Sequence, residues 1–367
     1  MSATRALAGP VARTLSRLAR ERVAMVSLAV LILIALACLF GPALTGHDPT
    51  RAYPDLRQLP AGLTAQPDPD HLRPALERLA FRMRARLDDV ARDGDALRLT
   101  LSAEAGVDRR SLVYLPRSDL FGEPHVIADT EGGKRLVVAV PLRRLSFPLG
   151  TDVHGRDLLT RCLVAGRVSL LIGLTATLVA LLIGVGYGAT AGFIGGAVDA
   201  VMMRLVDVLY ALPFVFFVIL LLVFFRASLT LMLVVIGAVE WLDMARIVRA
   251  QTLSLRERDF VRAARALGLG TPRIILRHIV PNTFGPVVVA ATLLVPQVIL
   301  LESFLSFLGL GVQEPDTSWG VLIAEGARAI ESAPHMLAGP AAFLITTLVA
   351  LTLLGDGLAD AVDPRAD

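Results

Sequence analysis

Cysteine is scarce in this sequence and lysine is nearly absent. The two cysteines, Cys38 and Cys162, are too few for a disulfide framework and stand in no zinc-binding pattern, so we expect both to be packing residues. Lys134 is the only lysine, and the formal net charge of +3 therefore comes almost wholly from arginine. The arginines lie at the ends of apolar runs and not in a patch with aromatic platforms, which argues against nucleic-acid binding.

A nucleotide-binding loop is also missing. A P-loop needs Gly, four residues, and then Gly-Lys followed by Ser or Thr, because its amides and lysine cradle the phosphates. The only Gly-Lys is Gly133-Lys134, with Ala128 where the first glycine belongs and Arg135 after the lysine. The histidines of segment 47–150 share no metal-ligand spacing. We expect no ATP site, no metal, no cofactor and no catalytic residue in this chain.

Long apolar runs are abundant. Hydrophobic residues make up 54% of the 367 residues, charged residues 19%, and the mean hydropathy is +0.64, values typical of a membrane protein. A helix needs roughly 20 apolar residues to cross a bilayer. Six runs qualify: Val23 to Gly46, Val168 to Val198, Val208 to Phe225, Ala227 to about Ile247, Ile279 to about Leu301, and Met336 to Gly355. We predict an all-α polytopic membrane protein with six transmembrane helices and a turn near Gly195-Gly196.

Arginine in short loops sets the orientation of these spans, because basic loops stay in the cytoplasm. The amino terminus and the segment from Arg246 to Arg277 are both rich in arginine. With six spans, both regions and both termini fall on the cytoplasmic side. The predicted order is a cytoplasmic segment at 1–22, a retained first transmembrane helix at 23–46, an extracytoplasmic insert at 47–150, a five-helix core at 151–356 and a cytoplasmic tail at 357–367.

The extracytoplasmic insert is predicted to be a small α+β domain. Apolar residues recur at helical spacing from Pro74 to Val90, with arginines opposite. Short alternating runs predict four strands, at Ala96 to Leu101, Leu112 to Leu115, His125 to Ala128 and Arg135 to Val140.

The cytoplasmic segment 249–281 begins with a predicted amphipathic helix. Ser254-Leu255-Arg256-Glu257 fits a capping box, which would start a helix from Ser254 to Leu267. Four apolar residues share one face of it: Phe260, Val261, Ala264 and Leu267. Alanines at 263, 264 and 266 make the helix slim enough to enter a cleft.

A glycine elbow follows this helix. Gly268 suits the left-handed conformation that ends a helix. Thr271 would cap a second short helix whose first residue is Pro272 and which runs to His278, and Pro281 would begin the next span. Such a helix pair could rest on lipid headgroups or dock on a partner protein, and the residues alone favour neither.

Charged residues near spans are candidates for a transport path, because burying charge in a membrane is costly. Glu240 is the best candidate, and Asp207 is placed near the cytoplasmic interface. Asp243 is expected to pair with Arg246 one helical turn away, and Glu302 to reach the outer interface.

The stretch before the second span has two interpretations. It predicts a turn and a capped helix, while Asp152 and Arg156 could also form an outer gate or a docking contact. Trp241 and Trp319 are expected to anchor at the membrane interface.

The segment RAARALGLGTPRIILRHIVP resembles the cytoplasmic docking loop of ATP-binding-cassette importer permeases. Ala263, Ala264, Gly268 and Pro281 match that loop's pattern in register, whereas Arg262 stands where the family has glutamate. Three further stretches resemble the dipeptide and oligopeptide permeases of the C-type branch: FPLGTDVHGRDLLTRCLVAGRVSLLIG, SFLGLGVQEPDTSWG and LLGDGLADAVDPR. The insert departs from the shorter connection expected in this family.

The resemblance implies a permease subunit in a bacterial inner membrane. Its expected partners are a second homologous permease subunit, two cytoplasmic ATPase subunits that use ATP and Mg, an extracytoplasmic substrate-binding protein and membrane lipid. The insert would then cover the outer mouth, help dock the binding protein or be passive. The implied ATPase-coupling residues are Phe260, Val261, Arg262, Ala263, Ala264, Leu267, Gly268 and Pro281.

Other functions remain open at this stage. Peptides are the leading substrate, and a related permease could carry nickel or another small solute. A secondary transporter or channel acting alone would show an internal repeat with paired broken helices, and none is evident. A membrane-anchored enzyme would need a reactive constellation in the insert, where no nucleophile–base pair or carboxylate pair of evident purpose is found.

Overall fold

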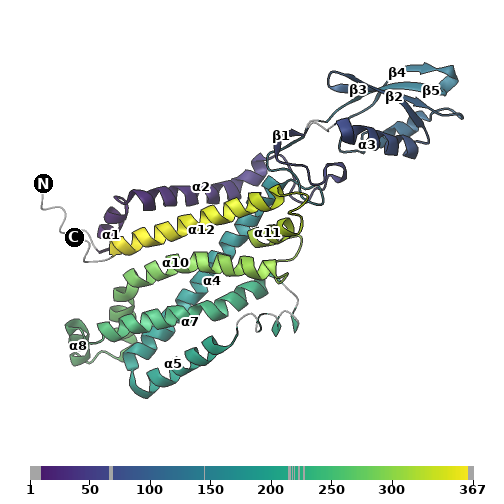
Figure 1. Ribbon diagram of the computed structural model, residues 1–367. Coiled ribbons are helices and arrows are strands. Elements are labelled where there is room, and N and C mark those ends of the chain that lie inside the picture. Colours follow the sequence, from purple (N-terminus) through teal and green to yellow (C-terminus); the bar gives the residue numbers. More distant parts are fainter. Residues whose placement is uncertain are drawn as a thin grey trace, which may run out of the picture. The chain divides into compact units, whose positions relative to one another are not determined.

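The computed structural model describes residues 10–65, 69–143, 145–213, 216, 218, 220–221, 224–225 and 228–362. The chain divides into two compact units (Figure 1). The helical unit comprises Met1–Gly46, Cys162–Arg328 and Leu337–Asp367, and the insert unit comprises His47–Arg161 and Ala329–Met336.

Long helices build the helical unit. Its elements are α1 (Pro10–Leu18), α2 (Arg22–Leu44), α4 (Leu158–Ile194), α5 (Gly196–Ala211), α7 (Leu229–Leu255), α8 (Asp259–Ala266), α9 (Thr271–Ile274), the π-helical turn η5 (Ile275–Ile279), α10 (Val280–Phe307), α11 (Trp319–Arg328) and α12 (His335–Val362). Within the described part of the chain, four helices are long and apolar enough to cross a membrane: Arg22–Leu44, Leu158–Ile194, Thr271–Phe307 and His335–Val362. They coincide with four of the six predicted spans.

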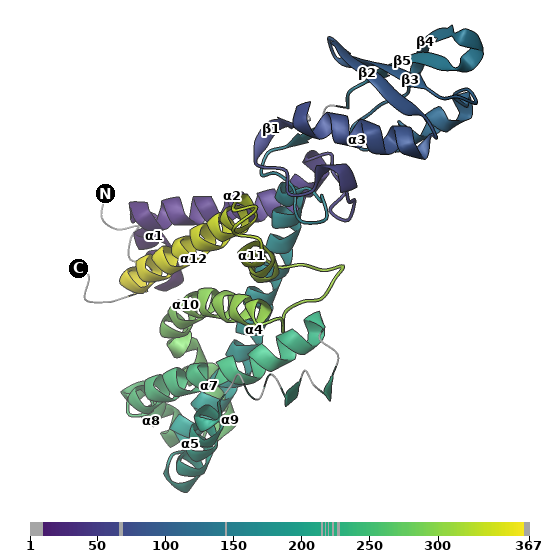
Figure 2. The ribbon, with the colours of Figure 1, turned by 45° about the vertical axis from the view of Figure 1, so that its right-hand side comes forward.

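Helix α4 is packed through its glycines. A Cβ atom on Gly184 would lie 2.6 Å from the Met244 side chain, and one on Gly188 would lie 2.3 Å from the Ala245 carbonyl oxygen. One on Gly192 would lie 2.9 Å from the Arg249 carbonyl oxygen. These glycines recur every fourth residue, so they form one stripe along which α4 and α7 approach closely. The helices α2 and α12 also run side by side (Figure 2), because a Cβ on Gly357 would meet Ala24 at 2.5 Å.

The predicted turn at Gly195-Gly196 is confirmed, since both residues have positive φ, 71° and 58°. The predicted third span, one helix from Val208 to Phe225, is wrong at its start. Helix α5 begins at Gly196 and ends at Ala211, and Leu212 is extended with ψ 133°. The cause is Pro213, because a proline disfavours helical backbone in the residue before it. The rest of that prediction falls largely outside the described residues.

From Leu229 on, the predicted fourth span lies within α7, which continues past its predicted end near Ile247. The Ser228 side chain caps α7 by accepting the Leu231 amide, and the helix runs to Leu255. The predicted capping box at Ser254 is therefore wrong, since Ser254 lies inside α7 and the next helix, α8, begins only at Asp259. Tertiary packing explains this, because Val248 and Thr252 are fully buried and contact the α4 glycine stripe.

The second helix predicted within segment 249–281 also differs from its prediction. Gly270 is the N-cap and Thr271 is already the first helical residue, so Thr271 does not cap. The helix does not stop near His278 but continues through η5 into α10, where the Val280 amide donates to the Ile275 carbonyl. A wide turn suits this place, because Pro281 lacks an N–H and its ring would clash with a carbonyl one turn earlier.

The insert unit is an α+β fold, as predicted. Its elements are η2 (Pro54–Leu56), β1 (Gly62–Ala65), α3 (Pro69–Arg82), β2 (Arg86–Asp93), β3 (Ala96–Ser102), η3 (Arg109–Tyr114), β4 (His125–Thr130), η4 (Glu131–Gly133), β5 (Arg135–Pro141) and β6 (Leu145–Phe147). The main sheet is antiparallel in the order β2-β3-β5-β4, and β1 pairs with β6. Alternate residues of β3 and β5, such as Leu99 and Val138, are fully buried.

Two predicted elements of the insert are wrong. The helix expected from Pro74 to Val90 ends at Arg82, and Leu87 and Val90 pair with β3 inside strand β2. Arg84, with φ 55°, makes the break between them. The strand expected at Leu112 to Leu115 is the 3-10 helix η3, capped by the Asp108 side chain, which accepts the Arg110 amide.

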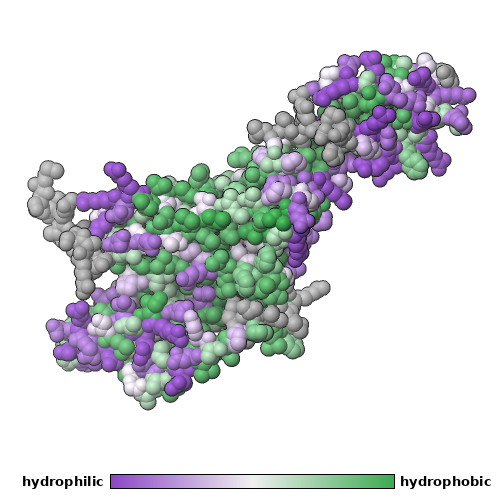
Figure 3. Space-filling model, in the orientation of Figure 1, coloured by the Kyte–Doolittle hydropathy of each residue, from purple (hydrophilic) through white to green (hydrophobic). Residues whose placement is uncertain are grey.

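The two units expose different surfaces. The visible face of the helical unit is largely apolar and that of the insert unit largely hydrophilic (Figure 3). Leu33, Leu182 and Val201 of the helical unit are 67%, 70% and 71% exposed. A soluble protein rarely exposes so much contiguous apolar surface, whereas lipid accepts it.

Candidate functional site

Helix α8 has one buried and one exposed face. Val261 is fully buried and Ala264 is 5% exposed, and both pack in the hydrophobic cluster that contains Val248 of α7 and Ile279 of η5. The opposite face is open, and Ala263 and the side chain of Arg262 are exposed there. The two buried side chains thus pack this face of the helix on the unit, while the opposite face remains exposed.

The apolar face of α8 is narrower than predicted. Phe260 and Leu267 were expected to share the face of Val261 and Ala264, but they are 40% and 80% exposed. Leu276 of η5 is also 71% exposed. Large apolar side chains at the surface of a polar segment favour contact with another molecule.

The glycine elbow is as predicted. Gly268 has φ 76°, a left-handed conformation in which glycine is favoured. Its amide donates to the Arg265 carbonyl over 2.9 Å, and the Leu269 amide donates to the Ala264 carbonyl over 3.2 Å. These bonds satisfy carbonyls at the end of α8, so the elbow is a defined turn. Pro281, the last of the predicted coupling residues, is exposed near the start of α10.

Two arginines of α7 make contacts that the sequence did not reveal. Arg246 of α7 bonds to Asp207 of α5 over 3.0 Å, so the expected Asp243–Arg246 pair is not formed. Arg249 bonds to Asp199 of α5, 50 residues earlier in the chain. The opposite charges were visible in the sequence, but their partnership depends on how α5 folds back beside α7.

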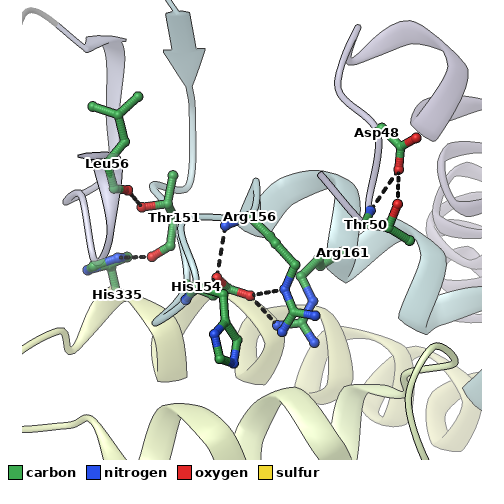
Figure 4. A network of polar contacts seen from close by, with 9 residues as sticks. Asp48, Thr50, Leu56, Thr151, His154, Arg156, Arg161 and His335 are labelled. Carbon is green, nitrogen blue, oxygen red and sulfur yellow. Dashed lines mark hydrogen bonds and ion pairs between the residues drawn. The ribbon is translucent and has the colours of Figure 1, made fainter. Parts of the chain in front are cut away.

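Asp152 is the centre of a buried polar network in the insert unit, and Figure 4 labels its partners His154, Arg156 and Arg161. Its carboxylate accepts the Arg156 Nε over 2.7 Å and an Arg161 guanidinium nitrogen over 2.6 Å. The backbone amides of His154 and Arg156 donate to its other oxygen, each over 2.8 Å. Burial by itself raises the pKa of Asp152, but the Arg161 charge and the Arg156 hydrogen bonds outweigh it, and the pKa lies below its usual value.

The residues around Asp152 form the predicted turn and cap. The Thr151 hydroxyl donates to the Leu56 carbonyl over 2.5 Å, and its backbone carbonyl bonds to His335 Nε2 over 3.1 Å (Figure 4). Asp157 accepts the Thr160 amide over 2.8 Å, capping the start of α4. Gly150, with φ 79°, lets the chain pass close to the Leu59 carbonyl. The network therefore ties these segments of the insert unit together.

Two residues expected at the membrane interface are buried inside the helical unit. Glu302 is fully buried and accepts hydrogen bonds from Ser306 and Ser318 over 2.7 and 2.6 Å. Trp319 is also fully buried, and its indole N–H donates to the Cys162 carbonyl over 2.9 Å. Both predictions are wrong, because both side chains are fully enclosed by protein. The Trp319 indole N–H and one Glu302 oxygen have partners there, whereas the other oxygen of Glu302 has no hydrogen-bond partner among the described residues.

The acidic path candidates occupy different surroundings. Glu240 of α7 is half-buried and takes part in none of the ion pairs found among the described residues. Asp207 is 57% exposed and engaged by Arg246. Of the four candidates, Glu240 and Asp207 belong to the helical unit, and Asp152 and Arg156 belong to the insert unit.

Two family models match the chain. Residues 180–367, which include α8 and the elbow, match the model described as "Binding-protein-dependent transport system inner membrane component". Residues 9–67 match "N-terminal TM domain of oligopeptide transport permease C". The segment 68–179, which holds most of the insert unit, lies between the two matches.

Several curated proteins are similar to it. The oligopeptide transport system permease protein OppC of Escherichia coli K12 is 56% identical over 216 residues, covering 59% of this chain and 72% of the relative. OppC of Haemophilus influenzae is 48% identical over 242 residues, covering 66% and 77%. The dipeptide transport system permease protein DppC of Bacillus subtilis is 46% identical over 217 residues, covering 59% and 68%.

Among solved structures, a chain of the inward-facing MetNI methionine ABC transporter is similar with a TM-score of 0.47 and 17% identity, covering 56% of this chain and 96% of that one. The family assignment comes from the sequence comparisons. The first family model matches just over half of the chain, and the relatives named above support the same assignment. The chain is a member of the binding-protein-dependent transport system inner membrane component family, whose members are membrane permease subunits.

Proposed function

We propose that this chain is a permease subunit of an ATP-binding-cassette importer for dipeptides or oligopeptides. It forms half of the translocation path and couples to a separate ATPase through α8 and the Gly268 elbow. The single observation that carries the coupling proposal is that one face of α8 is buried and the other is exposed. Val261 and Ala264 anchor it, while Phe260, Ala263 and Leu267 remain exposed on a segment that the family model includes.

The proposed arrangement assigns ATP chemistry to partner chains. Two cytoplasmic ATPase subunits bind ATP and Mg and grip α8, a second homologous permease completes the path, and an extracytoplasmic binding protein delivers substrate. Both termini lie in the cytoplasm and the insert unit lies outside. Binding of ATP to the partners must shift the equilibrium between two conformations of the permease. A difference of roughly 5.5 kcal/mol in affinity for the two conformations moves that equilibrium from 1:99 to 99:1.

Arg262 gives the docking surface a character of its own. Its guanidinium lies 3.6 Å from the Glu257 carboxylate, with both side chains more than half exposed. Such a pair is weak and opens readily. We propose that Arg262 leaves Glu257 to meet an acidic or neutral surface of the partner.

Co-purification tests the coupling proposal. Ala263→Glu places a charge on the open face of α8 without touching Val261 or Ala264. Ala200→Glu, on the exposed surface of α5, is the matched control. We expect the ATPase recovered with the unmodified chain to fall at least about tenfold with Ala263→Glu, because an unpaired charge at an interface costs more than one tenfold step in affinity.

Two outcomes would reject the proposal. Equal recovery of the ATPase with both variants would show that α8 is not the docking surface. Substrate movement by the chain alone in liposomes, without ATP, would identify a secondary transporter or channel instead.

The peptide substrate follows from the names of the relatives. A binding screen on the cognate binding protein, with dipeptides, longer peptides and nickel as ligands, tests it. Binding of nickel but of no peptide would overturn this part of the proposal.

The residues of the path remain a proposal as well. We place Glu240 in it, because its carboxyl is half-buried and engaged in no ion pair among the described residues. Glu240→Gln should change the transport rate while the ATPase still co-purifies, and an unchanged rate would exclude Glu240. Asp207, Asp152 and Arg156 are already engaged by charged partners, which favours a structural role for each.

A further inference from the structure

The corner between α4 and α5 depends on two glycines. Gly195 and Gly196 have φ of 71° and 58°, and a Cβ atom on Gly195 would lie 2.7 Å from an Arg256 guanidinium nitrogen. A side chain at Gly195 would therefore strain the backbone and displace the end of the Arg256 side chain. The corner is thus a turn whose backbone conformation favours glycine at both positions.

Two arginines hold the α4 side of this corner. Arg256, at the end of α7, donates to the Gly192 carbonyl over 3.1 Å. Arg265, in the last turn of α8, places its guanidinium carbon 4.7 Å from the centroid of the Phe193 ring. The planar guanidinium of arginine stacks on aromatic faces more effectively than an ammonium group. Arg265 therefore links the proposed coupling helix directly to the end of α4.

A third arginine holds the α5 side. The Arg249 Nε and a terminal nitrogen bond to the two carboxylate oxygens of Asp199 over 2.5 and 2.6 Å. A bidentate pair of this kind fixes orientation as well as distance. Asp199 lies in the first turn of α5, where a negative charge is also favoured by the helix dipole. Arginine side chains therefore contact both helices of the corner, α4 and α5.

We propose that Arg249, Arg256 and Arg265 form a clasp that carries displacement of α8 to the α4–α5 corner. Arg265 is the positioning residue that joins the coupling helix to the corner. This inference rests on the proposed function, because it needs an ATPase that moves α8. It goes further by naming the joint that responds.

Thiol labelling at the corner measures this displacement. Ala197→Cys puts an exposed thiol on the first turn of α5, and the native Cys38 and Cys162 are buried. In the complex with its ATPase in lipid nanodiscs, we expect ATP to change the labelling rate of this thiol. Adding Arg265→Gln should reduce that ATP-dependent change to less than about half, since an exposed cation–π contact shifts an equilibrium about two- to fivefold. Arg204→Gln, an exposed arginine of α5, is the control and should leave it intact.

A second variant and a partner-free measurement complete the test. Phe193→Leu removes the ring that Arg265 covers and should reproduce the effect of Arg265→Gln. In the chain alone, either variant should speed amide hydrogen exchange at residues 192–199 about two- to fivefold. An unchanged ATP response and unchanged exchange in both variants, with the ATPase still bound, would overturn the clasp alone. Absence of any ATPase from the unmodified complex would overturn the proposed function and the clasp with it.

Discussion

The helical unit and the insert unit differ in how closely their backbones approach and in which side chains they expose. In the helical unit, α4 and α7 touch through Gly184, Gly188 and Gly192, and large apolar side chains such as Leu182 face outward. In the insert unit, Leu99 and other large residues fill the interior, and charged residues cover the outside. The same chain therefore follows two packing rules.

The difference shows which solvent each unit is built for. Lipid is as apolar as leucine, so burying leucine between two membrane helices gains little, and close backbone approach becomes the useful contact. Water rewards burial of apolar area at about 25 cal/mol per Å², so the insert gains most from a filled core. Substitutions chosen to break one rule should therefore leave the other unit largely intact.

The largest effect is expected at the glycine stripe. Gly188→Leu would drive a side chain into the Ala245 carbonyl, because even a Cβ atom would lie 2.3 Å from that oxygen. Backbone atoms cannot move aside as a flexible side chain can, so the cost should exceed the 1–3 kcal/mol, roughly, of ordinary overpacking. We expect almost no monodisperse protein after purification in mild detergent.

Gly186→Leu is the matched control for that substitution. It lies on the same helix, two residues away, with no atom within 4 Å of a Cβ. It should be recovered like the unmodified chain. Equal losses for the two variants would mean that close packing against α7 does not explain the glycines of α4.

The next largest effect is expected at Asp152 in the insert unit. Asp152→Asn removes the charge that Arg156 and Arg161 share, and breaking a buried pair costs about 3 to 5 kcal/mol. Thermal unfolding at neutral pH, together with hydrogen exchange in the insert unit, measures this loss.

The contribution of Asp152 to stability should depend on pH in a defined direction. The pKa of Asp152 is lowered in the folded chain, so its contribution is complete above its unfolded pKa of about 3.9 and is lost as the pH falls through the folded value. The difference between unmodified chain and Asp152→Asn should be constant from about pH 7 to 5 and shrink below about pH 4. A difference that grows toward acid would contradict this account.

A cavity in the insert core should cost somewhat less. Leu99→Ala removes a fully buried side chain of β3, the strand that pairs with both β2 and β5. Such changes cost about 3 kcal/mol. Hydrogen exchange of the β3 amides measures the loss, and Val126→Ala, at a 39% exposed site on edge strand β4, should change it by less than about 0.5 kcal/mol. Similar losses at both sites would mean that the insert has no tightly packed core.

Apolar runs predicted the spans well because helix length and hydropathy are local properties. The four long apolar helices and the Gly195-Gly196 turn were all expected from them. The sequence did not predict the role of Gly184, Gly188 and Gly192. A glycine-rich half of a helix is compatible with flexibility or with close packing until the neighbouring helix is known. The pairing of Asp199 with Arg249 was hidden for the same reason.

Local signals failed where tertiary packing outweighed them. The capping box at Ser254 was plausible, yet α7 continues through it because Val248 and Thr252 are buried against α4. In the candidate site, Gly268 was predicted because a left-handed turn has a strong local preference. The division of α8 into buried Val261 and exposed Phe260 required the neighbouring helices, which sequence periodicity does not supply.

The smallest effect is expected for an ion pair on the surface of the insert. Arg109 bonds to Asp129 over 2.6 Å, but the two side chains are 65% and 30% exposed. Arg109→Ala should therefore change the stability of the insert unit by less than about 1 kcal/mol, and salt at about 0.5 M should reduce even that. In the helical unit, Arg249→Ala should matter more, because the Arg249 and Asp199 side chains are only 33% and 13% exposed. Hydrogen exchange in each unit compares the two. If Arg109→Ala and Arg249→Ala changed stability equally, side-chain exposure would not explain which ion pairs in this chain are structural. The contrast between the two units would then rest on apolar packing alone.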